Sequence, residues 1–67
     1  MATVVVQHAD GNEFFDSKTL AGAMRKAYSF IDKFAAEYED MAREHWRKTT
    51  IEPGELVYLT HRDRTGK

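Results

Sequence analysis

The sequence predicts an α+β fold in which one long helix packs on a small sheet, with elements in the order ββαβ, or βαβ if the first two strands do not pair. Three observations predict it: a valine-rich start that ends in Asp-Gly, a proline-free stretch from Lys18 to Lys48, and an alternating segment after the Pro-Gly pair. The 67 residues leave room for one small domain, so we expect residues 1–67 to form a single unit.

Residues 3–8 predict the first strand, because this segment contains three consecutive β-branched valines. The Asp-Gly pair at 10–11 is typical of a two-residue type I′ hairpin turn, which makes residues 12–15 the second strand. This turn would place His8 opposite Glu13. The alternative is that the chain simply loops from the first strand into the helix.

A helix is predicted over residues 17–48. Asp16 and Ser17 each offer a side-chain oxygen that can cap the first turn, and Gly22 is the only glycine from Lys18 to Lys48. Carboxylates four residues ahead of cations near the end of this stretch also favour a helix.

The Pro-Gly pair at 53–54 predicts a type II turn, and residues 55–61 predict a strand. This strand has apolar residues on both of its faces, which is typical of a strand that is covered on each side or joined to a partner. Residues 62–67 predict a frayed basic tail.

The length of the predicted helix suggests a second chain. About 32 helical residues span ~48 Å, whereas a seven-residue strand reaches ~24 Å and a globule of this size is roughly 30 Å across. Either the helix breaks near Gly22 to Ser29 and folds back on its own sheet, or its distal half packs against another copy. The distal residues of types common at interfaces are Tyr38, Met41, His45 and Trp46. We therefore predict a homodimer whose interface contains these four residues.

Composition adds few constraints. The formal net charge is −1 and cysteine is absent, so disulfides and thiolate metal sites are excluded and oligomerisation is the expected source of added stability. No stretch of 18 apolar residues or basic leader is visible, so we expect a soluble cytoplasmic protein without a membrane partner.

No pattern indicates catalysis or a cofactor. His8, His45 and His61 lack the spacing of a metal site. Ser17 and Ser29 are the only serines, and the glycines form no phosphate-binding loop. We expect no enzymatic activity, no metal and no cofactor.

The sequence thus predicts a small non-enzymatic regulatory or protein-interaction module that acts as a homodimer and binds another macromolecule, most simply another protein. Its size alone suggests a phage or mobile element as the source. One alternative is nucleic-acid binding through Arg62, Arg64 and Lys67 of the basic tail, together with the basic first half of the helix. Another is a small-ligand site at the dimer seam.

Overall fold

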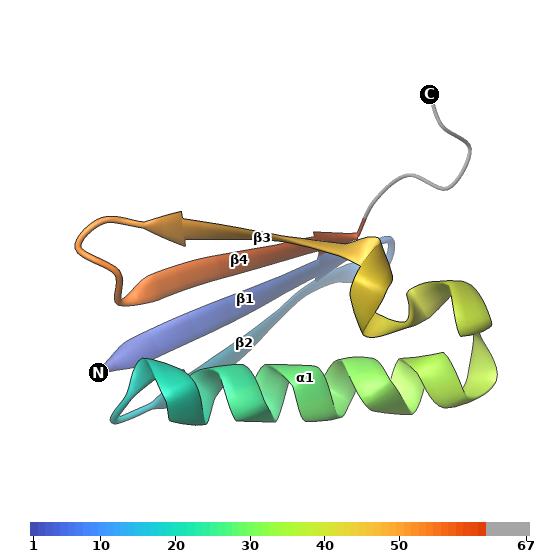
Figure 1. The fold of residues 1–67 in the computed structure, drawn as a ribbon, viewed down its shortest axis with the longest axis horizontal. Helices are drawn as coiled ribbons and strands as arrows, with labels where there is room; N and C mark the ends of the chain where they lie inside the picture. Colours follow the sequence, from blue (N-terminus) through green and yellow to red (C-terminus); the bar gives the residue numbers. More distant parts are fainter. Residues whose placement is uncertain (62–67) are drawn as a thin grey trace.

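The computed structural model describes residues 1–61 and has an α+β fold, as the sequence predicts (Figure 1). The sheet contains one strand more than predicted, because the chain returns to the sheet earlier than expected. The elements are β1 (Ala2–His8), β2 (Gly11–Ser17), α1 (Leu20–Glu37), the 3-10 turns η1 (Glu39–Met41) and η2 (Arg43–His45), β3 (Trp46–Ile51) and β4 (Leu56–His61).

Two hairpins form the sheet, and α1 connects them. The strand order is β2-β1-β4-β3. The central strands β1 and β4 are parallel, whereas β2 pairs with β1 and β3 pairs with β4 in antiparallel fashion. The arrangement is therefore a mixed sheet, in which strands from opposite ends of the sequence lie side by side at the centre (Figure 1).

The first hairpin is confirmed, but its turn lies one residue earlier than predicted. His8 pairs with Gly11, so Ala9 and Asp10 are the turn residues, and the predicted pairing of His8 with Glu13 is wrong. Gly11 has a φ of 133°, a backbone conformation that is unfavourable for every residue except glycine. The glycine is therefore the first residue of β2 and not a turn residue, and its positive φ is needed at that position.

The helix ends eleven residues before the predicted end at residue 48, which is a correction to the sequence analysis. It begins after Thr19, whose Oγ1 accepts a hydrogen bond from the Gly22 amide at 3.1 Å, so Thr19 is the cap in place of Asp16 or Ser17. It ends at Glu37, because Tyr38 has an extended backbone. Eighteen helical residues span about 27 Å, which fits within the 34 Å long axis of the molecule.

The chain after the helix folds back because two side chains bind it to the rest of the molecule. Arg43 of η2 donates two hydrogen bonds to the Asp32 carboxylate, at 3.0 and 2.8 Å. Trp46 is only 7% exposed and donates its indole N–H to the Met41 carbonyl at 2.8 Å. These contacts position residues 46–51 as strand β3 and not as helix.

The second turn also differs from its prediction. The Gly54 amide donates to the Ile51 carbonyl at 2.6 Å, and the Glu52-Pro53 peptide bond is cis. Proline is thus the third residue of the turn, as in a type VI turn, and not the second residue of a type II turn.

The core lies between α1 and one face of the sheet. Ala23, Ala27 and Ile31 recur every four residues along the helix and are fully buried, as expected for the apolar stripe of a helix that faces a sheet. Their partners in the core are Val4, Val6, Trp46, Val57 and Leu59. No helix among residues 1–61 is long and apolar enough to cross a membrane.

Candidate interaction surfaces

One face of the sheet is uncovered within residues 1–61, because the helix packs on the other. Strand pairing places twelve side chains on this face, in three rows of four across β2, β1, β4 and β3. The rows are Asp16, Thr3, Leu56 and Ile51; Phe14, Val5, Tyr58 and Thr49; and Asn12, Gln7, Thr60 and Arg47. We call these twelve residues the open face.

The centre of the open face is apolar. Val5 is only 3% exposed although it does not belong to the helix-side core, so its cover comes from the side chains around it. Phe14 beside it is 65% exposed and Ile51 is 40% exposed, and Leu56 and Tyr58 are half-buried. Exposed apolar side chains that adjoin one another in this way are typical of interaction sites.

Polar residues occupy one end of the open face, and at the other end they occupy only the half on β2 and β1. The Thr3 hydroxyl donates to the Asp16 carboxylate at 2.7 Å, and the Thr60 hydroxyl donates to the Gln7 side-chain oxygen at 3.1 Å. Asp16 and Arg47 are the only charged members, and the strand pairing places them at diagonally opposite corners. Both are exposed, and Arg47 has no ion-pair partner among residues 1–61.

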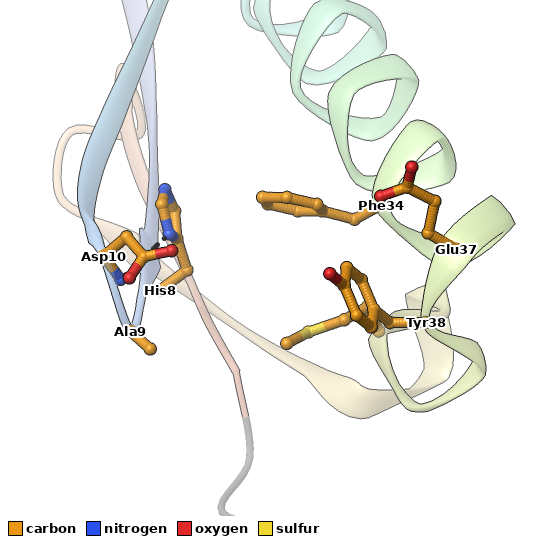
Figure 2. A pocket seen from close by; sticks show the side chains of 7 residues that line it. His8, Ala9, Asp10, Phe34, Glu37 and Tyr38 are labelled. Atoms are coloured by element: carbon orange, nitrogen blue, oxygen red, sulfur yellow. Dashed lines mark hydrogen bonds between the residues drawn. The ribbon is translucent and has the colours of Figure 1, made fainter.

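A second candidate lies on the helix side, where a pocket of about 280 Å³ separates the β1–β2 turn from the C-terminal end of α1. Figure 2 shows turn residues on one side of the space and helix residues on the other. The pocket is lined by His8, Ala9, Asp10, Phe34, Glu37, Tyr38 and Met41. We call it the helix-end pocket.

His8 is held tightly beside this pocket. Its Nδ1 accepts a hydrogen bond from the Asp10 amide at 3.3 Å, and its ring lies 5.5 Å from that of Phe34 and 5.9 Å from that of Phe30. The opposite nitrogen, Nε2, is buried without a hydrogen-bond partner among the described residues and lies 3.8 Å from the Glu13 carboxylate. Because Nδ1 accepts, the neutral ring carries its proton on Nε2.

The four residues that the sequence predicts at a dimer interface lie in two groups, which the hydrogen bond from the Trp46 indole to the Met41 carbonyl connects. Tyr38, 55% exposed, and the partly buried Met41 line the helix-end pocket. Trp46 and His45 lie near His61 instead, with ring-centre distances to it of 5.0 and 6.5 Å. Trp46 is buried within its own chain, so the length argument for a dimer through the helix is wrong.

The predicted nucleic-acid contacts Arg62, Arg64 and Lys67 lie outside the described residues. Within residues 1–61, no cluster of three or more histidine, aspartate and glutamate side chains is arranged to hold a metal ion.

An ion pair joins Asp32 of α1 to Arg43 of η2 at 2.8 Å. The hydrogen bonds and charge of Arg43 lower the pKa of the Asp32 carboxyl, and the same contacts raise the pKa of the Arg43 guanidinium. The guanidinium also lies 4.6 Å from the centre of the Tyr28 ring, a distance typical of a cation–π contact. One carboxylate and one aromatic ring of α1 thus bind one cation of η2.

Neither the open face nor the helix-end pocket was predicted from the sequence. The alternation in β4 indicated apolar residues on both faces, but the neighbours of that strand depend on a parallel pairing between residues more than fifty positions apart. The helix-end pocket requires the helix to stop at Glu37, which the sequence analysis did not predict. Comparison of the chain with protein-family models, with curated proteins and with solved structures finds no match.

Proposed function

We propose that this protein is a non-enzymatic interaction module that pairs with a second copy of itself through the open face. The observation that supports this most directly is the apolar row of Phe14, Val5 and Tyr58 on a sheet face without a cover among residues 1–61. Two sheets that pack face to face bury such rows against each other. The proposal keeps the homodimer expected from the sequence but moves its interface from the helix to the sheet.

The size of the face is compatible with a reversible dimer. Four strands about 4.8 Å apart and six residues at about 3.3 Å each give a face of roughly 19 by 20 Å, or ~400 Å² before side-chain relief is counted. Two such faces would bury about 800 Å² or somewhat more, which is below the ~1,200 Å² of stable specific interfaces and in the range of weak, transient ones. We therefore expect weak, reversible association that becomes substantial only at concentrations on the order of tens to hundreds of micromolar protein.

The corner charges define an orientation. A two-fold axis that runs diagonally through the interface, from the Ile51 corner to the Asn12 corner, carries Asp16 of one copy onto Arg47 of the other, twice per dimer. The open face is nearly square, because its three rows and its four strands span nearly equal distances. Rotation about the diagonal axis therefore places one open face on the other with their strands crossing near 90°, as in orthogonal sheet packing. Axes parallel or perpendicular to the strands instead place Asp16 over Ile51 or over Asn12.

A dimer of this kind leaves α1 and the helix-end pocket exposed to solvent, since both lie on the opposite side of the sheet. The helix side of each copy would then be available for the other macromolecule that the sequence analysis expects. Pairing would place two such sides at opposite ends of the assembly, which favours a role as a bivalent adaptor.

Two neighbouring threonines of β3 offer a matched test. Thr49 belongs to the open face, whereas Thr50, also exposed, points to the helix side. Sedimentation equilibrium from about 1 to 500 μM should show a reversible monomer–dimer equilibrium for the wild type. Thr49→Glu should weaken it at least tenfold, because a carboxylate would be buried against an apolar surface, and Thr50→Glu should leave it within twofold.

A wild type that remains monomeric at 500 μM would refute the proposal. So would equal effects of the two substitutions, since they introduce the same charge one residue apart on opposite faces. Circular dichroism of each variant establishes that the comparison concerns folded protein.

A further inference from the structure

We infer that the helix-end pocket binds a cationic group carried on an aliphatic stem, such as the guanidinium of an arginine side chain. Its lining combines the two carboxylates of Asp10 and Glu37 with the aromatic rings of Phe34 and Tyr38, and it contains no lysine or arginine. Carboxylates and aromatic ring faces both attract cations. An anion or a fully apolar ligand would leave these carboxylates uncompensated.

The positions of the side chains suit a flat, narrow ligand. In Figure 2, Asp10 lies on the turn side of the space, and Phe34 and Tyr38 project toward it from the end of α1. Tyr38 is 55% exposed, so its ring is accessible from solvent. The volume of about 280 Å³ is smaller than most drug-sized sites and is adequate for one long side chain.

The molecule binds one guanidinium in the same manner elsewhere. Arg43 lies 4.6 Å from the Tyr28 ring centre and hydrogen-bonds to the carboxylate of Asp32, one turn further along α1. In the pocket, the aromatic ring of Phe34 and the carboxylate of Glu37 come from the last turn of α1, three positions apart, and Tyr38 follows directly after the helix. The residue types that bind Arg43 thus recur at the end of the same helix.

The two carboxylates of the pocket have no cation of their own among the described residues. No ion pair or hydrogen bond joins the carboxylate of Asp10 or of Glu37 to any of residues 1–61; the hydrogen bond of Asp10 to His8 is made by its backbone amide. Two carboxylates that line the same pocket without a cation between them raise the local concentration of a cation there. The open face lies on the other side of the sheet, so this inference is independent of the proposed dimer.

The first experiment compares two isosteric probes. N-acetyl-arginine amide is titrated into ¹⁵N-labelled protein at low ionic strength, and the amide shifts of residues 8–10 and 34–41 are followed. The control probe is the citrulline analogue, in which a neutral urea replaces the guanidinium. We expect saturable shifts with the arginine probe and at least fivefold weaker binding of the citrulline probe; equal affinities, or no shifts with either, would overturn the inference.

Protein variants provide the second experiment. Asp10→Asn with Glu37→Gln removes both charges without a change in size and should weaken the arginine probe at least tenfold. Glu39→Gln with Glu44→Gln is the matched control, because it also removes two charges, and both of these exposed carboxylates lie outside the pocket lining. An equal loss in the control would mean that net charge, and not this pocket, attracts the probe, and the inference would be wrong.

A third comparison distinguishes the sources of the cation. Agmatine carries the guanidinium as a free small molecule, and acetyl-Gly-Arg-Gly-amide carries it within a peptide backbone. Binding of the peptide at least as tight as that of agmatine assigns the pocket to a basic side chain of a protein partner. Tighter binding of agmatine assigns it to a small guanidine or amine, and no binding of either refutes the cation site.

Discussion

Replacement of Trp46 by phenylalanine tests whether the chain returns to its own sheet after residue 37. The indole is 7% exposed and donates a hydrogen bond to the Met41 carbonyl at 2.8 Å. Phenylalanine keeps an aromatic ring at the site but has no donor and a smaller volume. The substitution therefore removes one hydrogen bond and leaves a gap in the core next to His61, whose ring centre lies 5.0 Å away.

The expected destabilisation follows from these two losses. A part-buried carbonyl without its donor costs ~1–2 kcal/mol, and a cavity of roughly 40 Å³ adds about 1 kcal/mol. The free energy of unfolding should therefore fall by about 2–3 kcal/mol. For 67 residues the total is only ~3–10 kcal/mol, so the change is a large fraction of it.

Urea unfolding followed by far-ultraviolet circular dichroism measures this difference, at a few micromolar protein so that association contributes little. With a slope near 1 kcal/mol per molar urea, the midpoint should fall by about 2–3 M. Tyr38→Phe is the control, because Tyr38 is 55% exposed, and its midpoint should change by less than about 0.5 M. If Trp46→Phe unfolds at the same urea concentration as the wild type, Trp46 is not buried by its own chain and our account of the helix end is wrong.

Two further predictions concern the helix and the first hairpin. Because the pKa of Asp32 is lowered, its ion pair stabilises the fold at pH values above the ordinary pKa of 3.8, and this contribution is lost as the pH falls through the lower folded pKa. An NMR titration of the carboxyl groups should give Asp32 a pKa below 3.8. Arg43→Gln should shift that pKa back toward 3.8. Gly11→Ala should destabilise the protein by about 1–2 kcal/mol, because a φ of 133° is strained for alanine. Steric clash is not the cause, since no atom lies within 4 Å of the added Cβ. A thermal midpoint equal to that of the wild type would contradict this explanation.

The elements that the sequence predicts well are those whose signals are local. The valine run and the Asp-Gly pair indicated the first hairpin, and the proline-free stretch that begins at Lys18 indicated the helix that starts at Leu20. The last strand was also predicted within one residue of its start. In each case, neighbouring residues suffice to determine the local structure.

The end of the helix could not be predicted in this way. Residues 38–45 contain good helix formers and favourable charge spacings, so local preference favours continuation. The chain turns because Arg43 reaches Asp32, eleven positions earlier, and because Trp46 is buried under the helix side of the sheet. One local pattern does favour the observed strand β3, namely the consecutive β-branched residues Thr49, Thr50 and Ile51.

The candidate surfaces depend on the same long-range pairings. That β4 would carry apolar residues on both faces was evident from its alternation, but the juxtaposition of Tyr58 with Val5 and Phe14 follows from the register of three strands. Asp16 and Arg47 become diagonal partners only when the strand order is known. Which side chains become neighbours on the open face can therefore be stated only once the complete fold is known.

A mixing experiment with charge-reversed variants tests the proposed dimer most directly. In Asp16→Lys each copy would present two positive corners to its partner, and in Arg47→Glu two negative corners, so each variant alone should sediment as a monomer at 100 μM. An equimolar mixture restores both opposite-charge pairs across the diagonal axis and should sediment as a heterodimer with roughly the wild-type affinity. A mixture that remains monomeric while the wild type dimerises, or single variants that dimerise as well as the wild type, would contradict pairing through the open face in this orientation.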